Sequence, residues 1–388
     1  MPGWHALTKH YEEQGQLKVV GVIQEQHSDR ARLFMQWKEM GWPLLVDSLN
    51  LLGVSGAPIT LFLDEAGVIK AINPKRGALS EFLGADPVGG AAPIWSGASR
   101  TALLAPVIND ELATADQQFL WGGLDGVTRA ISGYQKVLLE NPNHAEAQFR
   151  LGVAYRRRFD GERREANDFS LAVTHWGNAL ELNPNQYIWR RRIQQYGPRL
   201  SKPYSFYDWV HTARLDLREQ GVEPIRLSVE PGGAEFAHPS AGFEVRDVSV
   251  ENPDPQGRIF RDSENLIQID SVAVPSRLRA GEAVRIHLRM TPDEKKKVHW
   301  NNEVEDLKLW TEGVADWQIQ SRFHRYSVPE QAVTVEARTV EFELQAPEGT
   351  PPGIFTLRGY ALYYICEDVG GQCLYRRQDF EVPIDVVN

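Results

Sequence analysis

The residues with the clearest capacity for chemistry are Cys366 and Cys373, the two cysteines of a 388-residue chain. The residues that flank them are rich in β-branched and aromatic types or alternate apolar with polar, which is typical of β-strands. Gly370-Gly371 lies between the cysteines and favours the positive φ angles of a hairpin turn. Such a hairpin would place the two sulfurs on facing strand ends, within the Cα separation that a disulfide requires.

The residue types alone leave several uses of this pair open. A structural disulfide that closes so short a loop would contribute about 2.5 kcal/mol on the chain-entropy model. Two buried thiols or a redox-active pair are the alternatives, whereas a metal site would need four ligands. His299, in the His299–Glu303 cluster, is a further candidate that could tune a thiolate or bind a metal, although a lone histidine is more often a hydrogen-bonded loop residue.

The cysteine segment resembles the redox-active hairpin of the DsbD amino-terminal domain, which is immunoglobulin-like. The residues that carry the resemblance are, in chain order, Tyr363, Cys366, Asp368, Gly371, Cys373 and Tyr375. The turn between the cysteines is slightly longer here, and Arg376-Arg377 stands where the family commonly has prolines. The resemblance implies a catalytic pair that cycles between dithiol and disulfide by exchange with a thioredoxin-like partner, the second cysteine being the more readily attacked.

Three aromatic residues close to the cysteines, Tyr363, Tyr364 and Tyr375, are candidates for shielding the sulfurs. Shielding of this kind would restrict exchange to a docked partner.

The composition excludes several classes of partner. A net charge of -10 and a pI near 5.6 argue against a general binder of nucleic acid or anionic membranes, since either needs a positive field. No apolar run approaches the length of a membrane span, and residues 1–5 lack the basic-then-apolar order of a signal peptide. We therefore expect no nucleic-acid partner and no membrane span, and a chain of this length predicts about two or three domains.

Residues 263–388 consist mainly of short segments in which apolar and polar residues alternate. This pattern predicts an antiparallel, immunoglobulin-like β-sandwich. The predicted strands are 266–274, 283–289, 307–311, 340–344, 355–363 and 374–386. Residues 221–262, punctuated by Gly and Pro, are interpreted as an irregular linker.

Residues 1–75 predict a small α/β domain. Apolar periodicity indicates a helix over 3–14 and a buried strand over 17–23. Ser28 and Asp29 are candidate caps of a second helix, and residues 58–72 indicate a hairpin.

This segment resembles the thioredoxin-like family of the TlpA and alkyl-hydroperoxide-reductase type. The matching stretches are Val19–Val22, Pro43–Asp47, Gly53–Pro58 and Asp64–Gly67. In that family the proline at the position of Pro58 is cis, so the resemblance implies a structural cis bond at Ala57-Pro58.

The same resemblance aligns Met1-Pro2 with residues that directly follow the family's Cys-x-x-Cys motif. The catalytic cysteines and a central strand would then lie upstream, and we expect a truncated domain that lacks its nucleophile and leaves strand edges unpaired.

The middle of the chain predicts a linker over 76–108 and a helical domain over 109–220. The segments 130–138 and 172–180 each place small residues around an aromatic one and are followed by Asn-Pro-Asn, as in tetratricopeptide repeats. Arg190-Arg191-Arg192 is either a docking surface for an acidic partner or a solvated helix face.

These patterns together predict a multidomain α+β protein with a partial thioredoxin-like α/β domain, tetratricopeptide-type helical hairpins and a carboxyl-terminal immunoglobulin-like β-sandwich. The preferred hypothesis is thiol–disulfide exchange or electron relay through Cys366 and Cys373, in a periplasmic or other extracytoplasmic compartment, without cofactor or metal. Whether the chain is an enzyme stays open at this point. The alternative is a non-enzymatic scaffold that binds proteins through its helical repeats and carries a structural disulfide.

Overall fold

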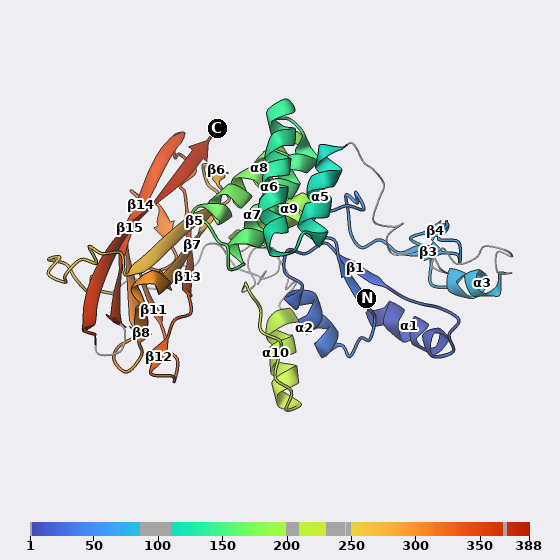
Figure 1. Ribbon diagram of the computed structural model, residues 1–388, viewed down its shortest axis with the longest axis horizontal. Coiled ribbons are helices and arrows are strands. Elements are labelled where there is room, and N and C mark those ends of the chain that lie inside the picture. The colour runs from blue at the N-terminus through green and yellow to red at the C-terminus, as the bar shows by residue number, and fades with distance from the viewer. Residues whose placement is uncertain (1, 86–109, 199–208, 230–244, 246–249, 368–370) are drawn as a thin grey trace. The chain divides into compact units, whose positions relative to one another are not determined.

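The computed structural model describes residues 2–85, 110–198, 209–229, 245, 250–367 and 371–388. The chain is a mixed α+β protein, as predicted (Figure 1). It divides into two compact units: unit 1 is Met1–Arg157, Asn178–Arg192 and Trp209–Glu230, and unit 2 is Arg158–Gly177, Ile193–Asp208 and Pro231–Asn388. Most of the predicted linker over 76–108 lies outside the described residues.

Unit 1 begins with short elements that largely follow the predicted order. They are α1 (Pro2–Glu13), β1 (Gly21–Ile23), α2 (Asp29–Trp37), β2 (Leu44–Val46), β3 (Leu61–Leu63), β4 (Ile69–Ile72) and α3 (Ala78–Gly84). The sequence did not indicate β2, which pairs in parallel with β1. Ser28 makes no side-chain cap bond, so its predicted capping role was wrong, whereas an Asp29 carboxylate oxygen accepts from the Arg30 N–H at 2.9 Å.

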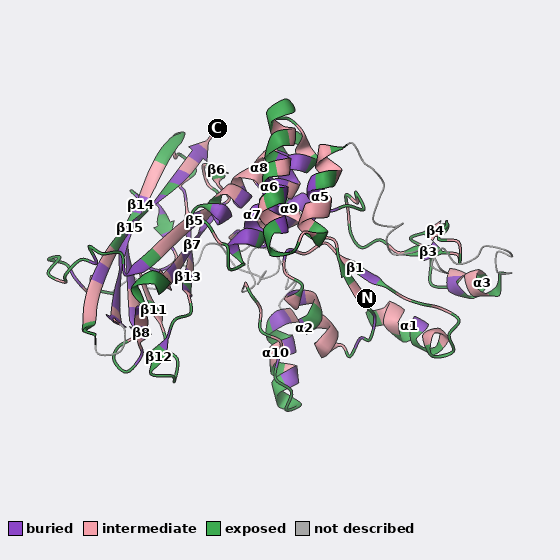
Figure 2. Ribbon diagram, in the orientation of Figure 1, coloured by how far each residue is buried: buried purple, intermediate pink, exposed green. Residues whose placement is uncertain are grey.

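The strands of unit 1 form two separate pairs, β1 with β2 and β3 with β4. Within β3 and β4 only Phe62 is buried (Figure 2). The exposed apolar residues on or beside the four strands are Val20, Val22, Leu45, Val46, Ile59, Leu61, Leu63, Val68, Ile69 and Ile72. These strands therefore bury little apolar surface within the described residues.

Helices make up the rest of unit 1 and part of unit 2. They are α5 (Glu111–Trp121), α6 (Gly123–Glu140), α7 (Ala145–Phe159), α8 (Asp168–Leu182), α9 (Tyr187–Gln194) and α10 (Trp209–Glu219). Both repeated segments are helical, α6 and α8 end just before the two Asn-Pro-Asn sequences, and the small residues Ala130 and Ala172 are fully buried. Small residues at such positions let neighbouring helices approach closely.

Buried polar contacts hold unit 1 together. Asp116 accepts from the Tyr134 hydroxyl at 2.7 Å and from Arg150 Nη1 at 2.6 Å. Arg192 is 1% exposed and donates to Gln26 Oε1 at 2.6 Å and to the Gln24 carbonyl at 2.9 Å. Neither prediction for the arginine run, docking surface or solvated face, holds for Arg192, because its guanidinium bonds backbone and amide oxygens inside the unit.

Unit 2 is built on two mainly antiparallel sheets whose long strands match the predicted ones. One sheet has the order β10 (Gln318–Ile319), β13 (Arg338–Gln345), β7 (Ala283–Pro292), β5 (Ile267–Val274). The other has the order β11 (Phe323–Tyr326), β9 (Leu307–Gly313), β14 (Gly353–Cys366), β15 (Cys373–Val387), β6 (Arg277–Arg279). Among the described strands of unit 2, only β6 pairs in parallel, with β15. A short strand, β8 (His299–Asn301), pairs with β14 and with β12 (Val333–Thr334).

Side chains of both sheets form one hydrophobic core. Ile286 and Leu288 of β7 belong to it, as do Leu357 and Ala361 of β14, and all four are buried. Because successive side chains of a strand point to opposite faces, the residues of β14 that alternate with these lie on the other face of its sheet. That second face carries the candidate site.

A buried ion cluster ties residue 196 to the first sheet within unit 2. His287 Nδ1 lies 2.9 Å from Glu341 Oε1, its Nε2 lies 2.7 Å from the Tyr196 carbonyl oxygen, and Arg285 also pairs with Glu341. Burial alone would raise the pKa of Glu341, but the charges and hydrogen bonds of His287 and Arg285 outweigh it and lower that pKa to about 2. Each ring nitrogen of His287 thus faces an oxygen acceptor, one from the Glu341 carboxylate and one from the Tyr196 backbone.

Candidate functional site

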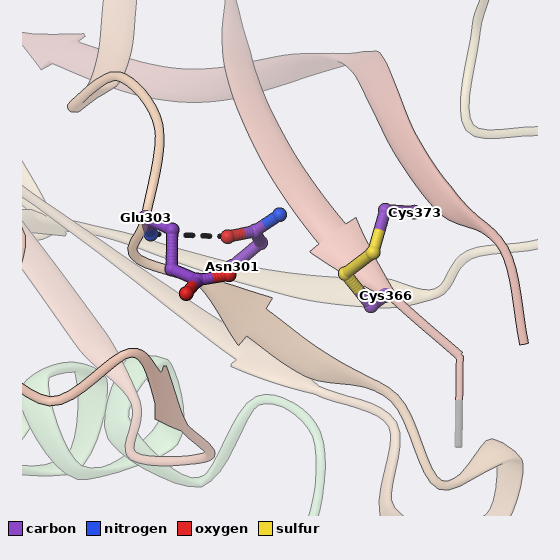
Figure 3. The surroundings of a disulfide bond; sticks show 4 residues. All are labelled: Asn301, Glu303, Cys366 and Cys373. Atoms are coloured by element: carbon purple, nitrogen blue, oxygen red, sulfur yellow. Dashed lines mark hydrogen bonds between the residues drawn. A yellow bond between two sulfur atoms is a disulfide. The ribbon is translucent and has the colours of Figure 1, made fainter. Parts of the chain in front are cut away.

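The two cysteines form a disulfide at the turn end of the β14–β15 hairpin. Cys366 is the last residue of β14 and Cys373 the first of β15, and the strand register places them directly opposite each other. Their sulfurs are 1.98 Å apart and their Cα atoms 4.0 Å apart (Figure 3). The predicted turn role of Gly370 falls outside the described residues.

The disulfide lies on the face of the sheet that points away from the main core. Ile365 and Tyr363 belong to the core cluster, so Cys366 and Tyr364, which alternate with them, lie on the opposite face. Farther along β14 on this face, Leu362 and Tyr360 pack with Trp310 in a separate apolar cluster. The sulfurs are therefore held at the sheet surface and not within the main core.

The two halves of the disulfide differ in exposure. Cys366 is 7% exposed, whereas Cys373 is an exposed residue. Exchange begins when a thiolate attacks one sulfur and the other sulfur leaves. The exposure therefore favours attack on Cys373 Sγ, with Cys366 Sγ as the leaving group.

Two of the tyrosines predicted to shield the sulfurs lie next to them on the same face. Tyr364 and Tyr375 are directly opposite each other, and their rings stack with centroids 4.3 Å apart. Partial burial is the main cause that raises the pKa of Tyr375 to about 12, and the neighbouring Tyr364 is the second cause. The Tyr375 phenol is therefore neutral at physiological pH, and its stack with Tyr364 forms an aromatic surface beside the disulfide.

Tyr363, the third tyrosine predicted to shield the sulfurs, lies on the other face of the sheet. Its ring is 1% exposed within the main core, and its hydroxyl donates to Asp262 Oδ2 at 2.7 Å. Burial, aided by that hydrogen bond, raises the pKa of Tyr363. The prediction was wrong for Tyr363 because strand alternation separates it from Cys366.

His299 lies on the neighbouring strand β8, directly opposite Cys366 in the antiparallel register. Residues directly opposite each other on antiparallel strands project to the same face, with Cβ atoms about 5 Å apart. His299, Cys366 and Cys373 thus form one row across β8, β14 and β15.

The residues that follow His299 fix β8 in place. Trp300 is fully buried, donates from Nε1 to the Glu336 carbonyl at 2.9 Å and packs against Arg338, whose guanidinium carbon lies 4.2 Å from the ring centroid. Asn302 donates to the Gln331 carbonyl at 2.8 Å. These contacts hold the row of three residues in register.

The loop after β8 brings an acidic group towards the disulfide. Figure 3 shows Asn301 and Glu303 in the surroundings of the two cysteines, with Asn301 Oδ1 accepting from the Glu303 N–H at 3.0 Å. Glu303 is exposed, and Glu367, directly after Cys366, is partly exposed. A carboxylate close to a sulfur disfavours a thiolate there.

Unit 1 contains the predicted structural proline. The Ala57-Pro58 peptide bond is cis, and both residues are exposed. A second cis bond, Val274-Pro275 in unit 2, had no signal in the sequence analysis. Residues 1–75 contain no cysteine, so unit 1 supplies no thiol.

The residues that the structure describes show neither a metal-binding cluster nor a membrane-spanning helix. They contain no group of three or more histidine, cysteine or acidic residues that could hold a metal ion. None of the helices in the described part of the chain is long and apolar enough to cross a membrane.

Sequence reasoning found the cysteines but not the row they form with His299. The strand that carries His299 has only three residues, and its pairing with β14 depends on anchors more than thirty residues away, such as Arg338. No local pattern contains that information.

No protein-family model matches the chain, and no curated protein sequence matches it. Among solved structures, the macrocyclization catalyst AvmM of alchivemycin A biosynthesis is 12% identical, covering 32% of this chain and 90% of its own, with a TM-score of 0.18. A type I cohesin–dockerin complex from Clostridium thermocellum is 9% identical, and the match covers 32% of this chain and 100% of the other, with a TM-score of 0.20. Spo0M, a sporulation control protein from Bacillus subtilis, is 15% identical, and the match covers 32% of this chain and 50% of Spo0M, with a TM-score of 0.18. Similarities this low carry no argument about fold or function.

Proposed function

We propose that the chain is a thiol–disulfide exchange or electron-relay protein whose reactive pair is Cys366 and Cys373. The observation that carries the proposal is the difference between the two halves of the bond: Cys373 is exposed and Cys366 is buried. A partner thiolate reaches Cys373 Sγ, and Cys366 remains protected within the sheet until the partner departs.

The length of the hairpin also favours an exchange role over a bracing role. The register of β14 and β15 runs without a shift from Gly353 opposite Val386 to Cys366 opposite Cys373. Ladder hydrogen bonds and core packing already fix this register, because a one-residue slip would move the core side chains to the other face. A disulfide at the end of this strand pair is therefore not needed to fix the strand register.

The proposal includes the domain assignments and the location of the protein. In it, residues 1–75 are a thioredoxin-like domain without a nucleophile, the helices are tetratricopeptide-type repeats and residues 263–388 are an immunoglobulin-like redox domain of the DsbD amino-terminal type. The partner is a thioredoxin-like protein or domain that supplies the attacking thiolate. An oxidising, extracytoplasmic compartment is consistent with a chain whose two cysteines are joined as a disulfide.

Trapping of a mixed disulfide tests the proposal. A thioredoxin whose second active-site cysteine is replaced by serine is mixed with the oxidised chain, and the adduct is mapped by peptide mass spectrometry. The proposal predicts an adduct on Cys373, none on the Cys366→Ser/Cys373→Ser control and none in the presence of excess dithiothreitol. An adduct confined to Cys366, or no adduct under conditions that trap a known substrate, would overturn it.

The second candidate function is a protein-binding scaffold in which the disulfide is inert. Exposed apolar side chains near the junction of α5 and α6 favour it, since Trp121 and Leu124 are each 73% exposed. On this hypothesis, replacement of Trp121 by serine weakens partner capture, whereas replacement of both cysteines leaves it unchanged.

A further inference from the structure

We infer that His299 exchanges a proton with the Cys366 sulfur when the disulfide opens and closes. The inference rests on the proposed function and adds a residue that the resemblance to the DsbD domain does not supply. The strand register places His299 directly opposite Cys366, on the side of β14 away from Cys373. Cys366 therefore has its disulfide partner on one neighbouring strand and an imidazole on the other.

The need for a proton donor follows from the surroundings of Cys366. When a partner thiolate attacks Cys373, the electron pair of the broken S–S bond stays on Cys366 Sγ. That sulfur belongs to a residue that is 7% exposed, so bulk water stabilises the new charge poorly. Any carboxylate close to the sulfur would add to this cost. An imidazolium on the next strand offsets that cost, either as a paired cation or by protonating the sulfur.

The step balances as follows. The partner sulfur bonds to Cys373 Sγ, the Sγ–Sγ bond breaks, and the proton of the His299 imidazolium is shared with Cys366 Sγ, so that a thiolate–imidazolium pair interconverts with a thiol and a neutral imidazole. The second thiolate of the dithiol partner then attacks the partner's own first sulfur and releases Cys373 as a thiolate, which takes its proton from water. The partner loses two electrons and becomes a disulfide, while this chain gains them and becomes a dithiol. In the reverse direction His299 removes the proton from Cys366.

Other charged and titratable groups also act on this pair, and the experiment must separate them. They are Lys297 before β8, Glu303 after it, Glu336 beyond β12, Tyr364 and Glu367 around the end of β14, and Cys373 at the start of β15. All of these groups are unchanged in the Cys373→Ser parent and in the two histidine variants made from it, except Cys373, which is serine in all three.

The first measurement is the pH dependence of alkylation of Cys366 by iodoacetamide in the Cys373→Ser background. His299→Gln is compared with the parent and with His10→Gln, which removes an exposed histidine of unit 1. Replacement of His299 is expected to slow alkylation at pH 7 by about tenfold and to move the midpoint of the rate profile to higher pH, because one pKa unit is a tenfold change in thiolate. Identical profiles in the parent and the His299→Gln variant would overturn the inference.

A second measurement needs no substitution at His299 and so does not depend on the folding of that variant. The pH midpoint of the His299 ring proton is followed by NMR in the oxidised and the fully reduced chain. If the ring and the Cys366 sulfur interact, each must shift the titration of the other by the same amount. We expect the midpoint to rise on reduction, whereas an unchanged midpoint would overturn the inference. Trapping at Cys373 together with an unchanged midpoint would leave the proposed function standing and exclude only the role of His299.

Discussion

Cys373 is exposed and lies directly opposite Cys366, which is 7% exposed, so the two ends of one disulfide face different environments. This asymmetry predicts different reactivities for the two thiols. In a Cys366→Ser variant the remaining Cys373 thiol should react with Ellman's reagent roughly tenfold faster than the Cys366 thiol of a Cys373→Ser variant at the same pH. The appearance of the thionitrobenzoate anion in stopped flow measures both rates. Equal rates would show that both sulfurs are equally accessible and would remove the basis for assigning attack to Cys373.

Reduction of the disulfide should destabilise unit 2 to a modest extent. The cysteines are separated by seven positions, so on the chain-entropy model the bond contributes about 2.5 kcal/mol to the free energy of unfolding. Urea unfolding of the oxidised and the dithiothreitol-reduced chain, monitored by tryptophan fluorescence, measures the difference. Complete unfolding of unit 2 on reduction would mean that the bond is a structural requirement, since an exchange protein must stay folded in both states.

The stacked pair Tyr364–Tyr375 should control access to the sulfurs. A Tyr375→Ala variant removes one ring of the stack and should be reduced faster by glutathione, with the larger part of the effect in the rate and not in the equilibrium. Tyr363→Phe is the control, because it changes a tyrosine of the paired strand β14 whose ring lies on the opposite face. It costs about 1 kcal/mol through the lost hydrogen bond to Asp262. Faster reduction of the Tyr363→Phe variant would contradict the assignment of faces.

The ion cluster around Glu341 should make the stability of unit 2 depend on acidity. The folded-state pKa of Glu341 is lowered to about 2, so its stabilisation is present above its ordinary value near 4.5 and is lost as the pH falls from there towards 2. The shift corresponds to about 3 kcal/mol at neutral pH. A Glu341→Gln variant should therefore be less stable at pH 7 and approach the parent near pH 2 in urea unfolding. A constant difference between the two across this range would mean that the charge of Glu341 is not the cause.

Much of the fold follows from local sequence, and the site does so only in part. The alternation of apolar residues predicted the long strands β5, β7, β9, β13, β14 and β15, and residue spacing predicted α6 and α8. Gly and Pro mark the turns, and the two cysteines mark the hairpin that carries the disulfide, because the chain has no other cysteine.

The remainder depends on contacts between residues distant in sequence. The pairing of His299 with Cys366 joins positions far apart along the chain, and the burial of Arg192 depends on Gln26, which lies 166 positions away. Tyr363 is an exception, because strand alternation counted from Cys366 is local information and places its side chain on the face away from the sulfurs. Propensity describes which residues form strands, and the register determines which of them meet.

The reduction potential of the Cys366–Cys373 pair tests the central claim most directly. The pair is equilibrated in glutathione buffers of known ratio, the thiols are trapped by acid and alkylation, and the oxidised fraction is measured by mass spectrometry. An exchange protein predicts a potential within the range of thiol oxidoreductases, about -270 to -120 mV, with full recovery of the fold after a cycle of reduction and oxidation. A potential below about -300 mV would show an inert structural disulfide and would contradict the account.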